Sequence, residues 1–156
     1  MTTFGGTAAR DGLAAALPAS ILSGLPSTLH ALTTGRDPLE ATMAAGSLVL
    51  PREHRPGRLI AAAVPVHFAV SLFWSIALAH GLPTRRTPAT GMLAGAGIAA
   101  LDLGVIGGRR RRLRALPLVP QLMDHLAFGI VVAHVIMRRR SNRKAEPRGW
   151  LPTQTN

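Results

Sequence analysis

The hydrophobic residues of this chain fall into long runs that short basic segments separate. The clearest run, 59–79, contains no Asp, Glu, Lys or Arg, and its single titratable side chain is His67. A helix over this run would be about 31 Å long, which matches the hydrocarbon core of a bilayer. A surface helix of a soluble protein would carry a polar stripe, and this run carries none. The pattern predicts a transmembrane helix.

The same pattern predicts five helices along the chain, within a bundle over residues 12–137. These helices cover residues 12–33, 38–50, 59–82, 89–107 and 116–137. We expect residues 1–11 to form a flexible N-terminus and residues 138–156 a basic, disordered C-terminal tail. The helix at 38–50 would be only about 20 Å long, so whether it spans stays open. The predicted fold class is an all-α, multi-pass transmembrane helical bundle of four to five helices.

Two short patterns give local detail. Asp37 and Pro38 stand where an N-cap and a first helical residue belong, and Glu40 is placed to complete a capping box. Gly91 and Gly95 form a GxxxG pair, which lets two helix backbones approach closely in lipid.

Charge follows the same division into apolar runs and basic segments. The formal net charge is +11, but Arg residues concentrate between the apolar runs, where lipid headgroups would meet them. We therefore expect contact with anionic headgroups at the Arg-rich loops and no nucleic-acid binding. If all five helices cross, each side of the membrane holds nine Lys and Arg, so the positive-inside rule gives no orientation.

Four ionisable residues fall within the predicted spans. Placing an ionisable side chain in the bilayer costs free energy, so each of them indicates a structural or functional role. They are His67, Asp102, Asp124 and His125. Helices that alternate in direction would bring them to a similar depth, about 8–13 Å from one basic end. One hypothesis is a buried His/Asp cluster that binds a ligand or conducts protons or cations. The alternative is a network of interhelical hydrogen bonds that holds three helices together.

Motifs for catalysis or cofactors are missing from the sequence. Cysteine is absent, which excludes thiolate catalysis and Cys-ligated metals. His67 and His80 do not share a helix face, which argues against a pair of haem ligands. Ser23-Gly24 lacks the preceding glycine of an intramembrane serine protease site, and Glu53-His54 lacks the second histidine of a zinc protease motif. We assign no catalytic residue, metal or cofactor.

Three stretches of the chain resemble a group of small, uncharacterised multi-pass membrane proteins of actinobacteria. They are residues 23–51, which contain Ser23-Gly24-Leu25-Pro26-Ser27 and Arg36-Asp37-Pro38-Leu39-Glu40, residues 98–107 with Asp102, and residues 114–136 with Asp124-His125. The resemblance implies a bacterial membrane location. It implies no activity and no catalytic residues.

The sequence thus predicts a multi-pass protein of the bacterial plasma membrane. The leading expectation is a structural or interaction component, as a homo-oligomer or with another membrane protein. One alternative is a small transporter or a proton or cation conductor that uses the His/Asp layer. A second alternative is a membrane enzyme that acts on lipid.

Overall fold

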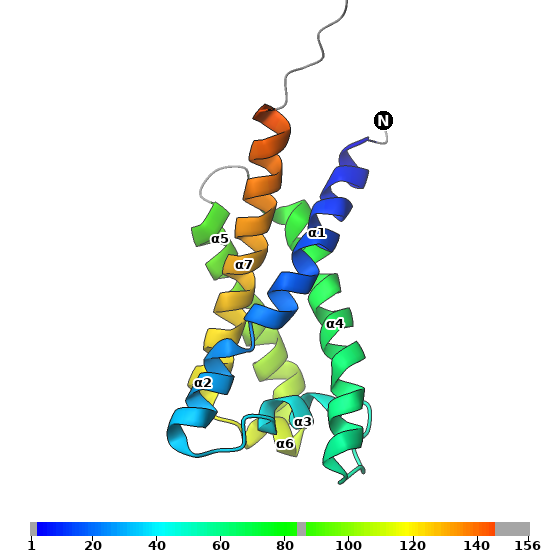
Figure 1. The fold of residues 1–156 in the computed structure, drawn as a ribbon, viewed down its shortest axis with the longest axis vertical. Coiled ribbons are helices and arrows are strands. Elements are labelled where there is room, and N and C mark those ends of the chain that lie inside the picture. Colours follow the sequence, from blue (N-terminus) through cyan, green and yellow to red (C-terminus); the bar gives the residue numbers. More distant parts are fainter. Residues whose placement is uncertain (1–2, 84–86, 146–156) are drawn as a thin grey trace, which may run out of the picture.

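The structure, a computed structural model, describes residues 3–83 and 87–145, and within these ranges the regular structure is helical, without strands. The elements are α1 (Thr3–Leu22), α2 (Leu25–Thr34), α3 (Glu40–Gly46), α4 (Pro56–Gly81), α5 (Thr87–Leu101), η1 (Asp102–Ile106), η2 (Gly107–Arg109), α6 (Arg111–Arg114) and α7 (Leu118–Ala145). The long helices run side by side along one axis, and α3 and α6 lie together at one end (Figure 1).

Four helical stretches of the described chain are long and apolar enough to cross a membrane. They are Gly6–Thr34, Pro56–Gly81, Pro88–Arg109 and Leu118–Ala145. At most 39% of the residues in each apolar window are buried within the protein, so large apolar side chains such as Leu17 and Phe73 face outward. A surface this apolar suits lipid, and the all-α, multi-pass membrane fold is confirmed.

The helix predicted at 38–50 does not span. Its helical part, α3, has seven residues and measures about 10 Å. Gly46 of α3 lies against the backbone carbonyl of Leu59, so α3 packs on the first turn of α4. The chain between Gly35 and Pro51 is too short to cross a bilayer and return, which keeps α3 at the end of the bundle where α4 begins.

The first span is longer than the predicted 12–33 and is broken in the middle. It begins at Thr3, so part of the segment expected to be flexible is helical, and it is interrupted at Ser23-Gly24 between α1 and α2. Pro26 lies in the first turn of α2, a position where a missing N–H costs no helical hydrogen bond. The predicted single helix is thus two helices, α1 and α2.

The last helix extends past the predicted end at 137 to Ala145. Asp11 of α1 is 1% exposed and accepts hydrogen bonds from Arg139 at 2.8 Å and from Arg143 at 2.7 and 2.6 Å. Arg140 donates to the carbonyl oxygens of Ala79 and Leu82 at the end of α4. These contacts explain why residues 138–145 are helical where we expected a disordered tail, whose remaining residues 146–156 lie outside the described chain.

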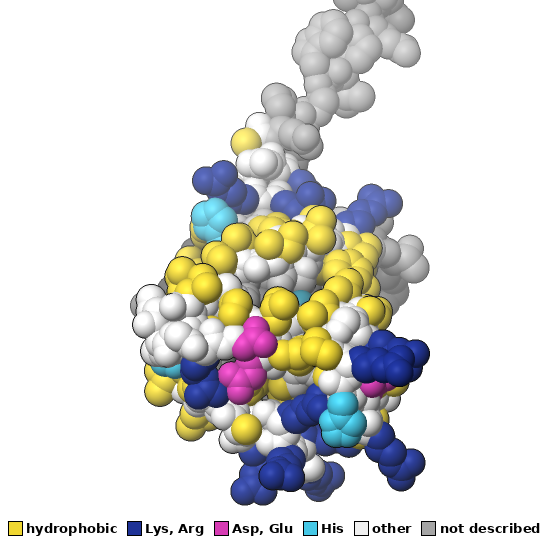
Figure 2. Space-filling view, turned by 60° about the horizontal axis from the view of Figure 1, so that its bottom comes forward, with side chains coloured by type: hydrophobic (Ala, Val, Ile, Leu, Met, Phe, Trp, Pro, Cys, Tyr) yellow, Lys and Arg dark blue, Asp and Glu magenta, His cyan; other side chains and the backbone are white. Residues whose placement is uncertain are grey.

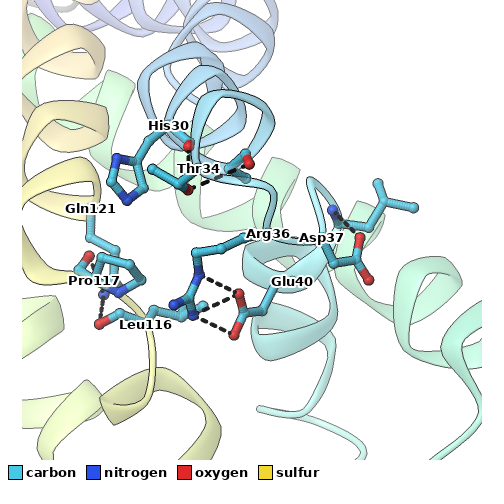
Figure 3. Close-up of polar contacts among 10 residues, drawn as sticks. His30, Thr34, Arg36, Asp37, Glu40, Leu116, Pro117 and Gln121 are labelled. Carbon is cyan, nitrogen blue, oxygen red and sulfur yellow. Dashed lines mark hydrogen bonds and ion pairs between the residues drawn. The ribbon is translucent and has the colours of Figure 1, made fainter.

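The capping pattern at Asp37 is realised differently from the prediction. The Asp37 carboxylate accepts from the backbone N–H of Leu39 at 2.8 Å, but α3 begins only at Glu40, and Leu39 occupies its N-cap. Glu40 pairs with Arg36 at 2.9 Å and does not complete a capping box (Figure 3). Because the guanidinium reaches both carboxylate oxygens, this ion pair is the stronger partner for Glu40.

The topology differs from the five-span prediction because α3 does not span. The start of α1 lies at the same end as the close of α4 and α7, and the connection between α2 and α3, which contains Arg36, lies at the other end with α6 and the start of α4 (Figure 1). The latter end carries many Arg side chains (Figure 2). Arg36 and Arg10 therefore exchange sides relative to the five-span expectation.

Close packing between α5 and α7 depends on three glycines. A Cβ atom on Gly91 would lie 2.5 Å from the carbonyl oxygen of Gly129, and one on Gly95 would overlap the carbonyl oxygen of His125. A Cβ on Gly129 would in turn overlap the carbonyl of Gly91. The GxxxG pair therefore lies at a helix contact where backbones touch.

We predict that Gly129→Ala lowers the midpoint of thermal unfolding in detergent, because the new methyl group overlaps backbone that cannot move aside. Overpacking of this kind costs about 1–3 kcal/mol. Gly97→Ala is the matched control, because a Cβ there meets no atom within 4 Å. Equal melting midpoints for the two variants would contradict the assigned helix contact.

Candidate functional site

A cavity of about 430 Å³ lies where the broken first span, α3, α4, η1 and α7 meet. Its volume falls in the range of small-molecule sites. Its walls include all four ionisable residues that the sequence places within the membrane: His67, Asp102, Asp124 and His125. Lys and Arg are missing from the described lining. The structure therefore gathers side chains from three different spans around one space.

Asp124 of α7 caps the N-terminus of α2. The first N–H groups of a helix have no partner within that helix, and in a membrane water cannot supply one. The Asp124 carboxylate accepts from the backbone N–H of Ser27 at 2.9 Å, across 97 residues of chain. The carbonyl oxygen of Gly24 accepts from both the backbone N–H of Thr28, at 3.1 Å, and the Thr28 hydroxyl, at 2.8 Å. Asp124 thus supplies a hydrogen-bond acceptor that a broken span would otherwise lack in lipid.

His125 connects α7 to the fourth apolar segment of the chain. Its Nδ1 lies 2.8 Å from the carbonyl oxygen of Gln121, one turn earlier in α7, and its Nε2 lies 3.3 Å from Oδ2 of Asp102. A carbonyl only accepts, so Nδ1 carries a proton. The contact with Asp102 then needs a second proton, on Nε2 or on the carboxyl group. The pair therefore holds one proton between the two helices.

His67 lies near the middle of α4, about 17 Å from its first residue. Its Nε2 lies 2.9 Å from the carbonyl oxygen of Ser20 and donates to it. Ser20 is in the last turn of α1, where carbonyls lack a helical partner. His67 and Asp124 thus hold the two sides of the break, one at a free carbonyl and one at a free N–H.

Asp102 opens a π-helical turn, η1, at the end of α5. The N–H of Gly107 bonds to the carbonyl oxygen of Asp102, five residues earlier. π-helical turns interrupt α-helices rarely and often at functional sites. Both Asp102 and His125 are partly exposed, at 24% and 21% of their side-chain surface, as expected for groups on a cavity wall.

The remaining predicted residues lie elsewhere. Gly91 and Gly95 serve the contact of α5 with α7, while Asp37 and Glu40 border a separate hollow of about 20 Å³. Pro38 is shared by both spaces. The sequence reading missed Asp11, because its partners Arg139 and Arg143 are distant in the chain.

It also missed polar residues that line the cavity, among them Ser20, Ser27, Thr42 and Gln121. Uncharged hydroxyls and amides are common in transmembrane helices and gave no signal of their own. The repeated serines around the Pro26 break are the one pattern that could have located this wall of the cavity.

The geometry limits the chemistry that the site can perform. A hydrolytic triad needs a histidine nitrogen that faces a hydroxyl nucleophile. Both ring nitrogens of His125 already face other groups, Asp102 and the carbonyl of Gln121. Within the described residues, His, Asp and Glu form no group of three that could hold a metal ion. The arrangement suits binding of a charged ligand and movement of a proton.

Comparison of the chain with protein-family models, with curated proteins and with solved structures gives no match.

We predict that Asp124→Ala destabilises the protein by about 0.5–2 kcal/mol, the usual cost of losing a helix cap, because the N–H of Ser27 is left without an acceptor. Hydrogen exchange at the amides of Ser27 and Thr28 should accelerate in this variant. Asp124→Asn keeps an acceptor oxygen and should protect these amides nearly as well as the native residue. Equally fast exchange in both variants would show that the carboxylate is not the cap.

Proposed function

We propose that this multi-pass membrane protein binds a small organic cation in the intramembrane cavity, as part of a transport function. The observation that carries the proposal is the convergence of two carboxylates, and no Lys or Arg of the described chain, on the wall of a cavity of about 430 Å³. A helical bundle that used polar groups only for packing would close on them. An open space beside ionisable groups in lipid favours a ligand.

Charge determines the class of ligand. The Asp102–His125 pair with its shared proton is neutral as a whole. The described lining thus holds two carboxylates and no Lys or Arg, so the cavity favours cations over anions. Its apolar lining favours a cation with an apolar body over a hydrated metal ion.

An aromatic wall supports the same class. Trp74 lines the cavity, and its ring packs edge to face on Phe73 with ring centroids 5.1 Å apart. A cation over the face of a tryptophan ring gains about 0.5–2 kcal/mol. Phe128 lines the cavity from α7. Substituted ammonium groups match this combination of carboxylate and aromatic surface.

The competing function, a structural or interaction component, is favoured by a different observation. Each ionisable residue of the cavity also connects two helical segments: Asp124 with α2, His67 with α1, and His125 with Asp102. In this alternative the residues stabilise the bundle, and the function lies in contacts with other proteins or further copies of the chain.

Two further parts of the proposal rest on the sequence. The resemblance to small membrane proteins of actinobacteria supports a bacterial plasma membrane as the location. Arg112 donates to the carbonyl oxygen of Glu53, so the basic segments 52–58 and 109–114 lie together at one end. This cluster supports contact with anionic lipid headgroups.

Isothermal titration calorimetry of the purified protein in nanodiscs, with benzyltrimethylammonium as the probe, tests the proposed function. We expect saturable binding of the cation and none of benzenesulfonate, an anion of similar size. Asp102→Asn should weaken cation binding at least tenfold, a change of about 1.4 kcal/mol, because it removes a carboxylate from the cavity.

Glu40→Gln is the matched control, because Glu40 pairs with Arg36 outside the cavity. The control should bind the cation like the native protein. Absence of saturable cation binding, together with an Asp102→Asn variant that is only less stable, would favour the structural function instead.

A further inference from the structure

We propose that the cavity exchanges a proton for the cation: binding of the cation to Asp102 releases the proton that Asp102 shares with His125. This inference rests on the proposed function, because it assigns a mechanism to the same cavity. It identifies Asp102 as the carboxylate for which the cation and the proton compete. Asp124 has a different role, as the cap of α2.

The two carboxylates differ in what neutralises them. Asp124 accepts from the N–H of Ser27 at the N-terminus of α2, where the helix dipole also favours a negative charge. Its compensation is part of the fold and does not depend on pH. Within the described chain, the Asp102 carboxylate is bonded only to the imidazole of His125, at 3.3 Å. The compensation of Asp102 is therefore a proton, which can leave.

The position of His125 limits how that proton is held. Nδ1 donates to the carbonyl oxygen of Gln121 at 2.8 Å, and this carbonyl cannot donate in return. The neutral ring must therefore keep its proton on Nδ1 and present the lone pair of Nε2 to Asp102. Loss of the shared proton turns an attractive contact into a repulsive one, and it leaves the Asp102 carboxylate without a partner. A cation can then take the place of the proton.

The charges around the pair favour exchange of a proton for the cation over binding of the cation without proton release. Beyond the pair itself, the titratable groups that line the cavity in the described chain are His67 from α4 and Asp124 from α7. The other lining segments, α1, α2, α3 and α6, contribute only uncharged residues. In a site of low dielectric constant, a cation and an imidazolium repel each other strongly. Release of one proton for each cation keeps the charge of the cavity constant.

The exchange is balanced in charge and in protons. The cation enters and pairs with the Asp102 carboxylate, and the proton on the pair passes to water. His125 remains as a neutral imidazole that is bonded to Gln121. The reverse step, protonation of the pair, expels the cation. A membrane protein with this cycle can use a proton gradient to move a cation against its own gradient.

Calorimetry of the native protein with benzyltrimethylammonium in two buffers of different ionisation enthalpy, at the same pH, counts the protons. We expect release of close to one proton per bound cation. The dissociation constant should fall by up to tenfold for each unit by which pH rises, in the range where the unoccupied pair still holds its proton. Equal enthalpies in both buffers and a dissociation constant that is independent of pH would overturn the exchange and leave the proposed function intact.

Two histidine variants on α7 locate the source of the proton. His125→Gln keeps a side-chain donor near Asp102 but cannot titrate, so proton release and the pH dependence of binding should disappear. His134→Gln is the matched control, because His134 is exposed and lies outside the cavity, and it should release the proton like the native chain. Undiminished release by His125→Gln would overturn the assignment to the pair.

The native measurement requires no variant, so the proposal stays testable if a variant fails to fold. A native protein that binds no cation would overturn both the proposed function and the exchange. A native protein that binds the cation without proton release would overturn the exchange alone.

Discussion

Backbone polar groups within a membrane must find their partners inside the protein, because lipid tails offer neither donors nor acceptors. The break between α1 and α2 is where this chain meets that requirement with side chains. Asp124 accepts from the N–H of Ser27, and His67 donates to the carbonyl oxygen of Ser20. Through these two bonds the first span depends on both α7 and α4. The residues that make these two bonds also line the cavity.

The bundle is packed differently along its length. Small buried residues such as Ala15, Ala19 and Ala133 let the spans approach closely, and Asp11 ties α1 to the end of α7 through Arg139 and Arg143. The cavity lies beyond this closely packed part, towards α3 and α6. Glycine contacts between α5 and α7 reach as far as Gly95, which lies against the backbone at His125. A close-packed contact of this kind fixes the position of the histidine that faces Asp102.

The sequence predicts the spans well because hydrophobicity over about 20 residues is a local property. It also predicts the depth of the four ionisable residues, since depth follows from position along a helix. It misjudges 38–50, because a 13-residue apolar run fits a short span and a packed end segment equally well. The Asp11 ion pairs and the cap of α2 by Asp124 join residues that are about 100 or more positions apart. No local pattern encodes such contacts without the packing that creates them.

The structural and the functional interpretations of the polar cluster therefore concern the same bonds. Asp124 illustrates why they need not compete: its carboxylate is satisfied by Ser27 and α2, so the fold itself accounts for it. Asp102 is different, because its bond to His125 exists only while a proton remains between them. A group retained for stability alone would be more secure with a permanent donor such as the N–H of an amide. The dependence on a proton, beside an open cavity and at a π-helical turn, is the feature of this site that packing does not explain.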